Sequence, residues 1–306
     1  MADPVITPFI KELAKALQIS RNVNYATLAG LVTAYFDWLL TFDSEVRLIW
    51  NANGVKIKVL YMITRYLPLV CPFLNLYYRF GDATTSECDA LYKAGGTMFA
   101  VSAIGAALIV TLRTWAIWAT AKPVIYALFG IVTVTVVLCF VLLFISWRDI
   151  NHLTVALNLP FGCIPRYGSV VPAAFLVEAA YDLVILLLLV TRAASLCERF
   201  PERLDLSSSK RLNTDRWGRN SPLFQTVFYD GILLYVYITV VSVANVVLLF
   251  SNSDYEPFLL PIQGTLRSVL SCRIVLHIRM KDDELVRNGL PTMTTCGPST
   301  VQIDPE

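Results

Sequence analysis

Long apolar stretches separated by short polar segments make up most of the chain. Seven of them can be marked, and each is about 18 to 25 residues long. An α-helix rises 1.5 Å per residue, so about 20 residues cross a hydrocarbon core of about 30 Å. Because unpaired backbone groups are costly in lipid, uninterrupted runs of this length indicate helices. The predicted spans are residues 25–42, 55–78, 97–118, 123–145, 170–190, 226–250 and 256–277.

This pattern predicts an all-α, polytopic membrane protein that folds as a bundle of seven transmembrane helices. Composition agrees, because 56% of the residues are hydrophobic, only 16% are charged and the mean hydropathy is +0.59. Soluble domains carry about 25% charged residues. We expect residues 25–280 to form the transmembrane domain, with a short amphipathic helix in an extracytoplasmic segment, 1–24, and a disordered cytoplasmic tail, 281–306.

Lysine and arginine residues near the ends of the spans predict the orientation. With the N-terminus outside, the inward-facing segments carry 15 of these residues and the outward-facing segments carry 7. The loop 191–225 contributes most to the difference. The chain is therefore predicted to be integral to the plasma membrane, with its C-terminus in the cytoplasm. The loop is either a solvated basic segment beside anionic lipid or a docking surface for a cytoplasmic partner.

An aspartate lies inside the first apolar stretch. On a helix it shares a small, polar stripe, and larger apolar side chains occupy most of the remaining surface. Such stripes are the surfaces by which helices pack in lipid, so Asp37 is expected to face the bundle. Asp43 and Ser44 are expected to cap a short helix at the inner interface. The stripe consists of Gly30, Thr33, Asp37 and Thr41.

Two motifs in this region, DWLLTFDSEVRLIW (37–50) and KVLYMITRY (58–66), resemble the signature of a large family of fungal membrane proteins. The family is abundant in mushroom-forming fungi and is described only by an N-terminal domain of unknown function. Shorter pieces are also similar to it: LRTWAIW (112–118), YDGILLY (229–235) and SCRIVLHIR (271–279). The resemblance covers about residues 24 to 280 and implies a seven-span protein of unassigned activity, with no implied chemistry.

Ionisable residues within or at the ends of the spans are costly in lipid and usually face the bundle in pairs. Asp37 and Arg65 both lie about 18–20 Å below the outer edge, which predicts an intramembrane ion pair. Arg113, Asp230 and Arg273 gather near the inner end. They either snorkel to the interface or form a charge cluster that switches the cytoplasmic side.

Glu178 and Asp182 are four residues apart and therefore stack on one face of the fifth span. Tyr181 borders that face, and Arg267 of the seventh span lies at a similar depth. Two acids this close cannot both ionise cheaply unless a cation lies between them. The four residues are the candidate site for a ligand or ion, and the alternative is an internal structural network.

Two cysteines, Cys88 and Cys163, fall in segments predicted to lie outside, where disulfides form. We therefore predict a bond between them, with two free thiols as the alternative. Cys71, Cys139 and Cys272 lie in spans, where free thiols are common.

The sequence argues against several membrane enzymes and cofactor proteins. Its only histidines are His152 and His277, too few for an embedded zinc site or a haem held by paired histidines. No span has a lysine near its middle for a retinal Schiff base. We therefore predict no enzyme activity, no cofactor, no metal and no nucleic-acid partner. The partners expected are the lipid bilayer and a small extracellular ligand of a receptor-like protein; the alternative function is a transporter or channel that uses the buried charges.

Overall fold

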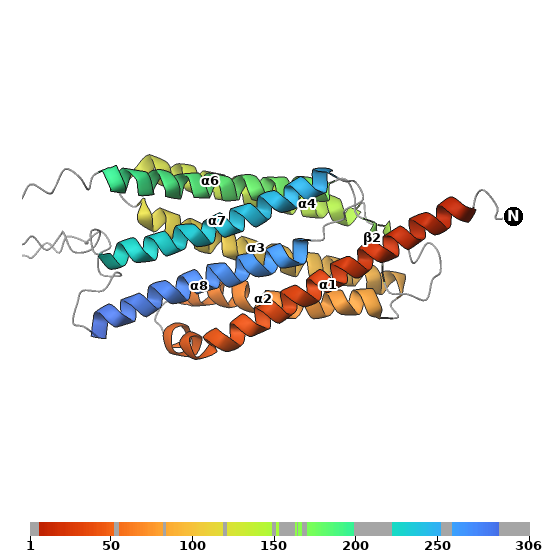
Figure 1. The fold of residues 1–306 in the computed structure, drawn as a ribbon, viewed down its shortest axis with the longest axis horizontal. Helices are drawn as coiled ribbons and strands as arrows, with labels where there is room; N and C mark the ends of the chain where they lie inside the picture. The colour runs from red at the N-terminus through yellow and green to blue at the C-terminus, as the bar shows by residue number, and fades with distance from the viewer. Residues whose placement is uncertain are drawn as a thin grey trace, which may run out of the picture.

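The computed structural model describes residues 6–51, 55–81, 84–118, 121–148, 151–152, 163, 165–166, 170–198, 222–251 and 259–287. These residues form long α-helices that lie side by side along one axis (Figure 1), with one π-helical turn and one small β-ladder. The helices are α1 Ile6–Glu45, η1 Val46–Trp50, α2 Val55–Phe80, α3 Thr85–Ile117, α4 Lys122–Arg148, α6 Val171–Glu198, α7 Pro222–Ser251 and α8 Leu260–Arg287. The strands β1 Asn151–His152 and β2 Pro165–Arg166 pair antiparallel.

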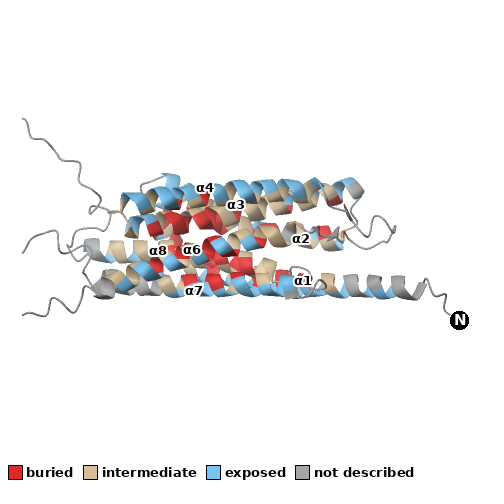
Figure 2. Ribbon diagram, turned by 90° about the horizontal axis from the view of Figure 1, so that it is seen from above, coloured by how far each residue is buried: buried red, intermediate tan, exposed pale blue. Residues whose placement is uncertain are grey.

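Two helices occupy the middle of the bundle. Helix α3 packs against α2, α4, α6 and α8, and α8 packs against α1, α2, α3 and α7. Buried residues therefore gather where the helices face one another, whereas the outer faces are exposed (Figure 2). The largest apolar cluster joins α3, α4, α6, α7 and α8 through residues such as Val110, Leu128, Ile185, Tyr235 and Ile274.

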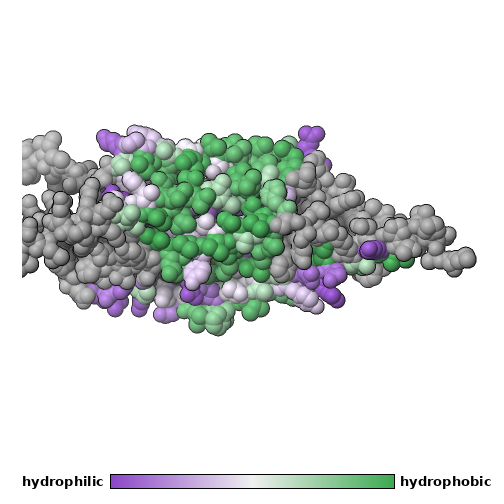
Figure 3. Space-filling model, turned by 45° about the horizontal axis from the view of Figure 1, so that its top comes forward, coloured by the Kyte–Doolittle hydropathy of each residue, from purple (hydrophilic) through white to green (hydrophobic). Residues whose placement is uncertain are grey.

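The outer surface has the apolar character of a protein that contacts lipid. Within the described residues, four helical segments are long and apolar enough to cross a membrane: Val55–Phe80, Ser86–Ile117, Lys122–Arg148 and Pro172–Ser195. Apolar side chains form a broad band over the face drawn in Figure 3, with hydrophilic ones mainly toward its ends. Large apolar residues such as Val134, Phe140 and Phe144 of α4 are exposed. These exposed side chains are shielded from water only if they contact a bilayer or another apolar partner.

Helices α1 and α8 carry more polar residues than these four segments, and several of these polar side chains face the interior. On α8, the buried residues include Gln263, Arg267, Ser268 and Ser271. The hydropathy averaged along such a helix is therefore lower than the hydropathy of its outer face. Helix α7 is apolar over Ile232–Leu248.

Helix α1 differs from the sequence prediction in three details. Residues 6–24, expected to hold a separate short helix, continue into α1 without a break. The buried stripe holds Gly30 and Asp37 as predicted, but Thr33 is exposed and Ala34 is buried in its place. The predicted cap at Asp43 and Ser44 is wrong, because the chain stays helical through them and η1 begins after Glu45 without a side-chain cap.

Gly30 allows α1 and α8 to approach closely. A Cβ atom at this position would lie 3.0 Å from Thr265 Oγ1 and 3.3 Å from the Pro261 carbonyl oxygen of α8. These distances are shorter than ordinary van der Waals contact. A small residue is therefore needed where the stripe of α1 meets α8.

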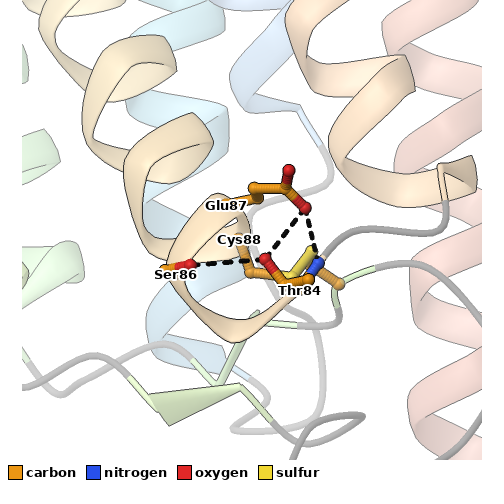
Figure 4. Close-up of a disulfide and its surroundings, with 5 residues drawn as sticks. Thr84, Ser86, Glu87 and Cys88 are labelled. Atoms are coloured by element: carbon orange, nitrogen blue, oxygen red, sulfur yellow. Dashed lines mark hydrogen bonds between the residues drawn. A yellow bond between two sulfur atoms is a disulfide. The ribbon is translucent and has the colours of Figure 1, made fainter.

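One end of the bundle, called here the disulfide end, is closed by the predicted Cys88–Cys163 bond, whose Cα atoms lie 5.8 Å apart. The Cys163 N–H also donates to the Tyr78 carbonyl at the end of α2, at 2.8 Å. Nearby, Glu87 accepts hydrogen bonds from the Thr84 N–H at 2.8 Å and the Thr84 hydroxyl at 2.9 Å (Figure 4). These bonds fix the start of α3.

Two prolines interrupt the hydrogen bonding of α2. Pro68 has no N–H, so the Thr64 carbonyl oxygen loses its intrahelical partner. Ser268 of α8 donates to that oxygen at 2.6 Å, and Ser102 of α3 lies 3.5 Å from it. In lipid such replacement is required, so this carbonyl ties α2 to the two central helices.

Candidate functional site

Two groups of charged and polar side chains lie in the bundle, and most of their members are buried; Arg273, with a side chain that is 49% exposed, is an exception. We call the first the motif cluster; it consists of Asp37, Thr41, Glu45, Trp50, Tyr61, Arg65, Tyr66 and Arg273. We call the second the α6–α8 cluster; it consists of Glu178, Tyr181, Asp182, Ser242, Asn245, Gln263 and Arg267.

Asp37 of α1 is the centre of the motif cluster. Its carboxylate accepts from the Arg65 guanidinium of α2 through Oδ2 and from Arg273 Nε of α8 through Oδ1, at 2.5 Å. Arg65 also donates to the Thr41 hydroxyl. Asp37 and Arg65 are 2% and 3% exposed. The structure thus brings together the two residues expected to pair and adds a third helix to them.

Glu45 extends the motif cluster toward the end of α1 and is completely buried. Its Oε1 accepts from the Tyr66 hydroxyl at 2.7 Å and from Trp50 Nε1 at 3.2 Å. Its Oε2 lies 3.4 Å from the Tyr61 hydroxyl and 3.6 Å from Arg65 Nε. Every oxygen of this carboxylate therefore has a partner, as a buried charge requires.

Sequence reasoning missed Glu45 because counting along a straight helix placed it at the membrane interface. The short turn of η1 and the start of α2 fold back over it instead. Lys58 Nζ and Arg279 Nη1 hold this turn by donating to the Trp50 and Leu48 carbonyl oxygens, at 2.5 Å and 3.1 Å. A signal was present, because the two family-like motifs, 37–50 and 58–66, supply all of the cluster except Arg273.

The α6–α8 cluster centres on Arg267, which is 4% exposed. Its Nη1 lies 2.6 Å from Glu178 Oε1, and its Nη2 contacts Asp182 Oδ2. The two acids share a face of α6 because they are four residues apart. One guanidinium thus lies between two carboxylates, and its positive charge lowers the free-energy cost of ionising both acids.

A row of hydrogen bonds leads to Asp182 from α7 and α8. Asn245 Nδ2 donates to Gln263 Oε1 at 2.6 Å, and Gln263 Nε2 donates to Ser242 Oγ at 3.1 Å. Ser242 Oγ in turn donates to Asp182 Oδ2 at 2.7 Å. All three donors point along the row toward the carboxylate and stabilise its charge. Ser242, Asn245 and Gln263 were not singled out by the sequence reasoning.

Tyr181 does not donate to either acid. Its hydroxyl lies 3.0 Å from the Ala107 carbonyl oxygen and 2.7 Å from Thr111 Oγ1, both on α3. Tyr181 nonetheless lines a cavity of about 10 Å³ together with Asp182 and Arg267. Glu178 is not part of this lining.

A second cavity, of about 50 Å³, lies on another side of Arg267 among α1, α2, α3 and α8. Its polar lining includes Thr27, Asn75, Ser102 and Thr265. By volume it holds only a few water molecules. Of the four candidate residues, Tyr181, Asp182 and Arg267 thus adjoin the first cavity and Arg267 alone adjoins the second.

Arg113 and Arg273, which were expected to gather near the inner end, have different partners in the structure. Arg273 pairs with Asp37, about 20 Å along α8 from its start, which is the depth estimated for Asp37 itself. The expectation placed Arg273 deeper because it started the span at residue 256, whereas α8 begins at Leu260. The Arg113 guanidinium lies over the ring of Tyr235, 6.0 Å from its centroid. The side chain of Asp230 lies outside the described residues.

Among the described residues, no three His, Cys, Asp or Glu side chains are grouped as they would be in a metal site. Cys71, Cys139 and Cys272 are free thiols in this part of the chain.

Residues 25–70 match a family described as "Family of unknown function (DUF6533)". This segment contains the second half of α1, η1 and most of α2, and with them all of the motif cluster except Arg273. No curated protein and no solved structure matches the chain. The fold, the apolar helices and this match together define a helical, membrane-type protein with an N-terminal segment similar to a family of unknown function.

Proposed function

We propose that the protein is a receptor-like, seven-span membrane protein that senses a small extracellular ligand at the α6–α8 cluster. The position of α8 is the observation that carries the proposal. Arg267 of α8 holds two carboxylates of α6, and six residues further along Arg273 holds Asp37 of α1. A ligand that draws Arg267 away from α6 therefore acts on a helix that is also tied to α1.

The orientation in this proposal places the disulfide end outside the cell. An oxidising compartment suits the Cys88–Cys163 bond, and the basic loop 191–225 then lies in the cytoplasm. In the same proposal this loop docks a cytoplasmic partner; residues 199–221 lie outside the described residues. Membrane insertion is in the plasma membrane, and no catalytic activity is part of the proposal.

The small size of the two cavities favours a receptor over an open channel. The larger one, of about 50 Å³, is far from a continuous pathway and admits only a few waters. A larger ligand binds only if helices around Arg267 move apart. Because Arg267 belongs to α8, such movement also displaces Arg273 of the same helix, which pairs with Asp37 of α1.

A thermal-shift screen of small polar metabolites against the purified full chain tests the proposal. A true ligand raises the unfolding midpoint of the wild type, because binding to the folded state stabilises it. The Glu178→Gln variant should lose this shift. Glu284→Gln is the matched control, because Glu284 is exposed near the end of α8 and pairs with Lys281 at 2.9 Å. Shifts that survive Glu178→Gln would place the ligand elsewhere.

A transporter is the second candidate, and the interruption of α2 favours it. Pro68 and Pro72 line the cavity of about 50 Å³ and remove two backbone N–H groups from α2, which stays helical; transporters commonly bind ions and substrates where helical hydrogen bonding is interrupted. Uptake of ²²Na⁺ and of any screened ligand into proteoliposomes distinguishes the two functions. Accumulation that depends on Arg267 favours the transporter, whereas ligand binding without uptake favours the receptor.

A further inference from the structure

The two clusters differ in formal charge. In the motif cluster, Asp37 and Glu45 are balanced by Arg65 and Arg273. In the α6–α8 cluster, Arg267 is the one basic partner of Glu178 and Asp182 in the part of the chain that the structure describes, so the cluster has a formal charge of −1 when both acids are ionised. A net charge away from water is costly in a membrane. One further positive charge would make the cluster neutral.

A space for such a charge adjoins Asp182. The cavity of about 10 Å³ has room for about one water molecule, which also suits a small monovalent ion. Oxygen-bearing side chains of three residues besides Asp182 line it: Tyr181, Tyr235 and Thr239. Tyr235 is 4% exposed, and its hydroxyl has no hydrogen-bond partner of normal geometry among the described residues.

The other two hydroxyl groups belong to Tyr181 and Thr239, which line this space; the Tyr181 hydroxyl also lies 2.7 Å from Thr111 Oγ1. Tyr181 Oη donates its proton to the Ala107 carbonyl oxygen at 3.0 Å, and Thr239 Oγ1 donates to the Tyr235 carbonyl oxygen at 2.9 Å. Each hydroxyl oxygen keeps lone pairs that are free of these bonds. A carboxylate together with neutral oxygens is the ligand set preferred by hard cations.

We propose that this cavity binds one sodium ion, held by the Asp182 carboxylate and the hydroxyl oxygens of Tyr181, Tyr235 and Thr239. The ion neutralises the α6–α8 cluster. Two positive groups act against it: Arg267, which also lines the cavity, and Arg113, which lies over the Tyr235 ring. Repulsion by Arg267 is offset because both of its terminal nitrogens already contact carboxylates.

The ion site deepens the proposed function and rests on it for its physiological meaning. Sodium then binds Asp182, and the sensed ligand acts on Arg267, which pairs with Asp182, so binding of one changes the affinity for the other. Sodium binding itself can be measured without the ligand.

Thermal unfolding of the purified full chain in NaCl and in N-methyl-D-glucamine chloride, at one pH and one ionic strength, tests the site. The unfolding midpoint should rise with the logarithm of the NaCl concentration once that concentration exceeds the dissociation constant, because sodium binds the folded state. Thr239→Val removes one oxygen ligand and leaves the ion pairs in place. This variant should need about tenfold more NaCl for the same shift, the effect of losing one interaction of hydrogen-bond size.

Three further measurements make the test decisive. Asp182→Asn should abolish the sodium-dependent shift. Thr133→Val, the same substitution at an exposed hydroxyl of α4 that bonds only its own helix, should leave it unchanged. KCl should shift the midpoint less than NaCl. Equal midpoints in sodium and N-methyl-D-glucamine, equal shifts in NaCl and KCl, or an unaltered shift in Thr239→Val would each overturn the sodium site. Sodium binding without any ligand response would reject the proposed function alone.

Discussion

The motif cluster and the α6–α8 cluster are built from the same kinds of side chain but differ in how their charged groups are paired and in whether they border a cavity. In the motif cluster, each carboxylate oxygen of Asp37 and Glu45 has a partner, and neither residue lines either of the two cavities described above. In the α6–α8 cluster, Asp182 and Arg267 border cavities. Fully satisfied networks rigidify a bundle, whereas incompletely filled ones leave room for binding.

The two clusters also differ in how they are assembled and in their formal charge. The motif cluster is built from residues 37–66 together with Arg273 of α8, and its ion pairs connect α1, α2 and α8. The α6–α8 cluster is assembled from distant segments and carries a formal charge of −1. Charged groups that are retained in a membrane without full compensation commonly mark functional positions.

The largest expected effect is the loss of the Asp37–Arg65 pair. Asp37→Asn and Arg65→Leu should each lower the free energy of unfolding by about 3–5 kcal/mol, because the remaining charge is buried without its partner. Since the residues are in contact, the double variant should be less damaging than the sum of the two. Denaturation in detergent, followed by a folding-sensitive signal, measures all three. Strictly additive losses would show that the two side chains do not depend on each other.

Removing one acid from each cluster should give effects of different size. Glu45→Gln should destabilise the fold by about 1–3 kcal/mol, because the carboxylate accepts from Tyr66 and Trp50 and faces Arg65. Glu178→Gln should be near neutral or stabilising, because it removes the uncompensated charge and leaves Arg267 paired with Asp182. Both variants keep the shape of the side chain, so the comparison isolates charge.

This comparison is made by measuring the thermal unfolding midpoints of Glu45→Gln, Glu178→Gln and the wild type together in buffer without sodium. Equal destabilisation by Glu45→Gln and Glu178→Gln would contradict the view that only the motif cluster is electrostatically complete.

Much of the fold could be predicted, because a run of about 20 apolar residues has few stable alternatives in lipid. Contacts between residues of equal depth were also predictable. Asp37 with Arg65, and Glu178 and Asp182 with Arg267, follow from helical rise and the four-residue repeat.

What could not be predicted depends on departures from straight helices. Glu45 is buried because η1 turns the chain back, a feature without a simple sequence signal. The partner of Arg273 was missed because a four-residue error in the start of α8 shifts depth by about 6 Å. Ser242 and Gln263 went unnoticed because neutral polar residues in apolar spans have no preferred partner until the helices are placed.

The smallest effect concerns the contact between α8 and the interrupted helix α2. Ser268 follows Arg267 on α8 and donates to the Thr64 carbonyl oxygen freed by Pro68, at 2.6 Å. Ser268→Ala should lower the free energy of unfolding by about 1 kcal/mol, because a buried acceptor loses its best donor. Ser102→Ala is the matched control, since its hydroxyl lies 3.5 Å from the same oxygen and contributes less. If Ser102→Ala proves the more damaging, the Thr64 carbonyl oxygen is bound mainly by α3 rather than by α8. Helix α8 would then be less firmly attached to α2 than the Ser268 contact indicates.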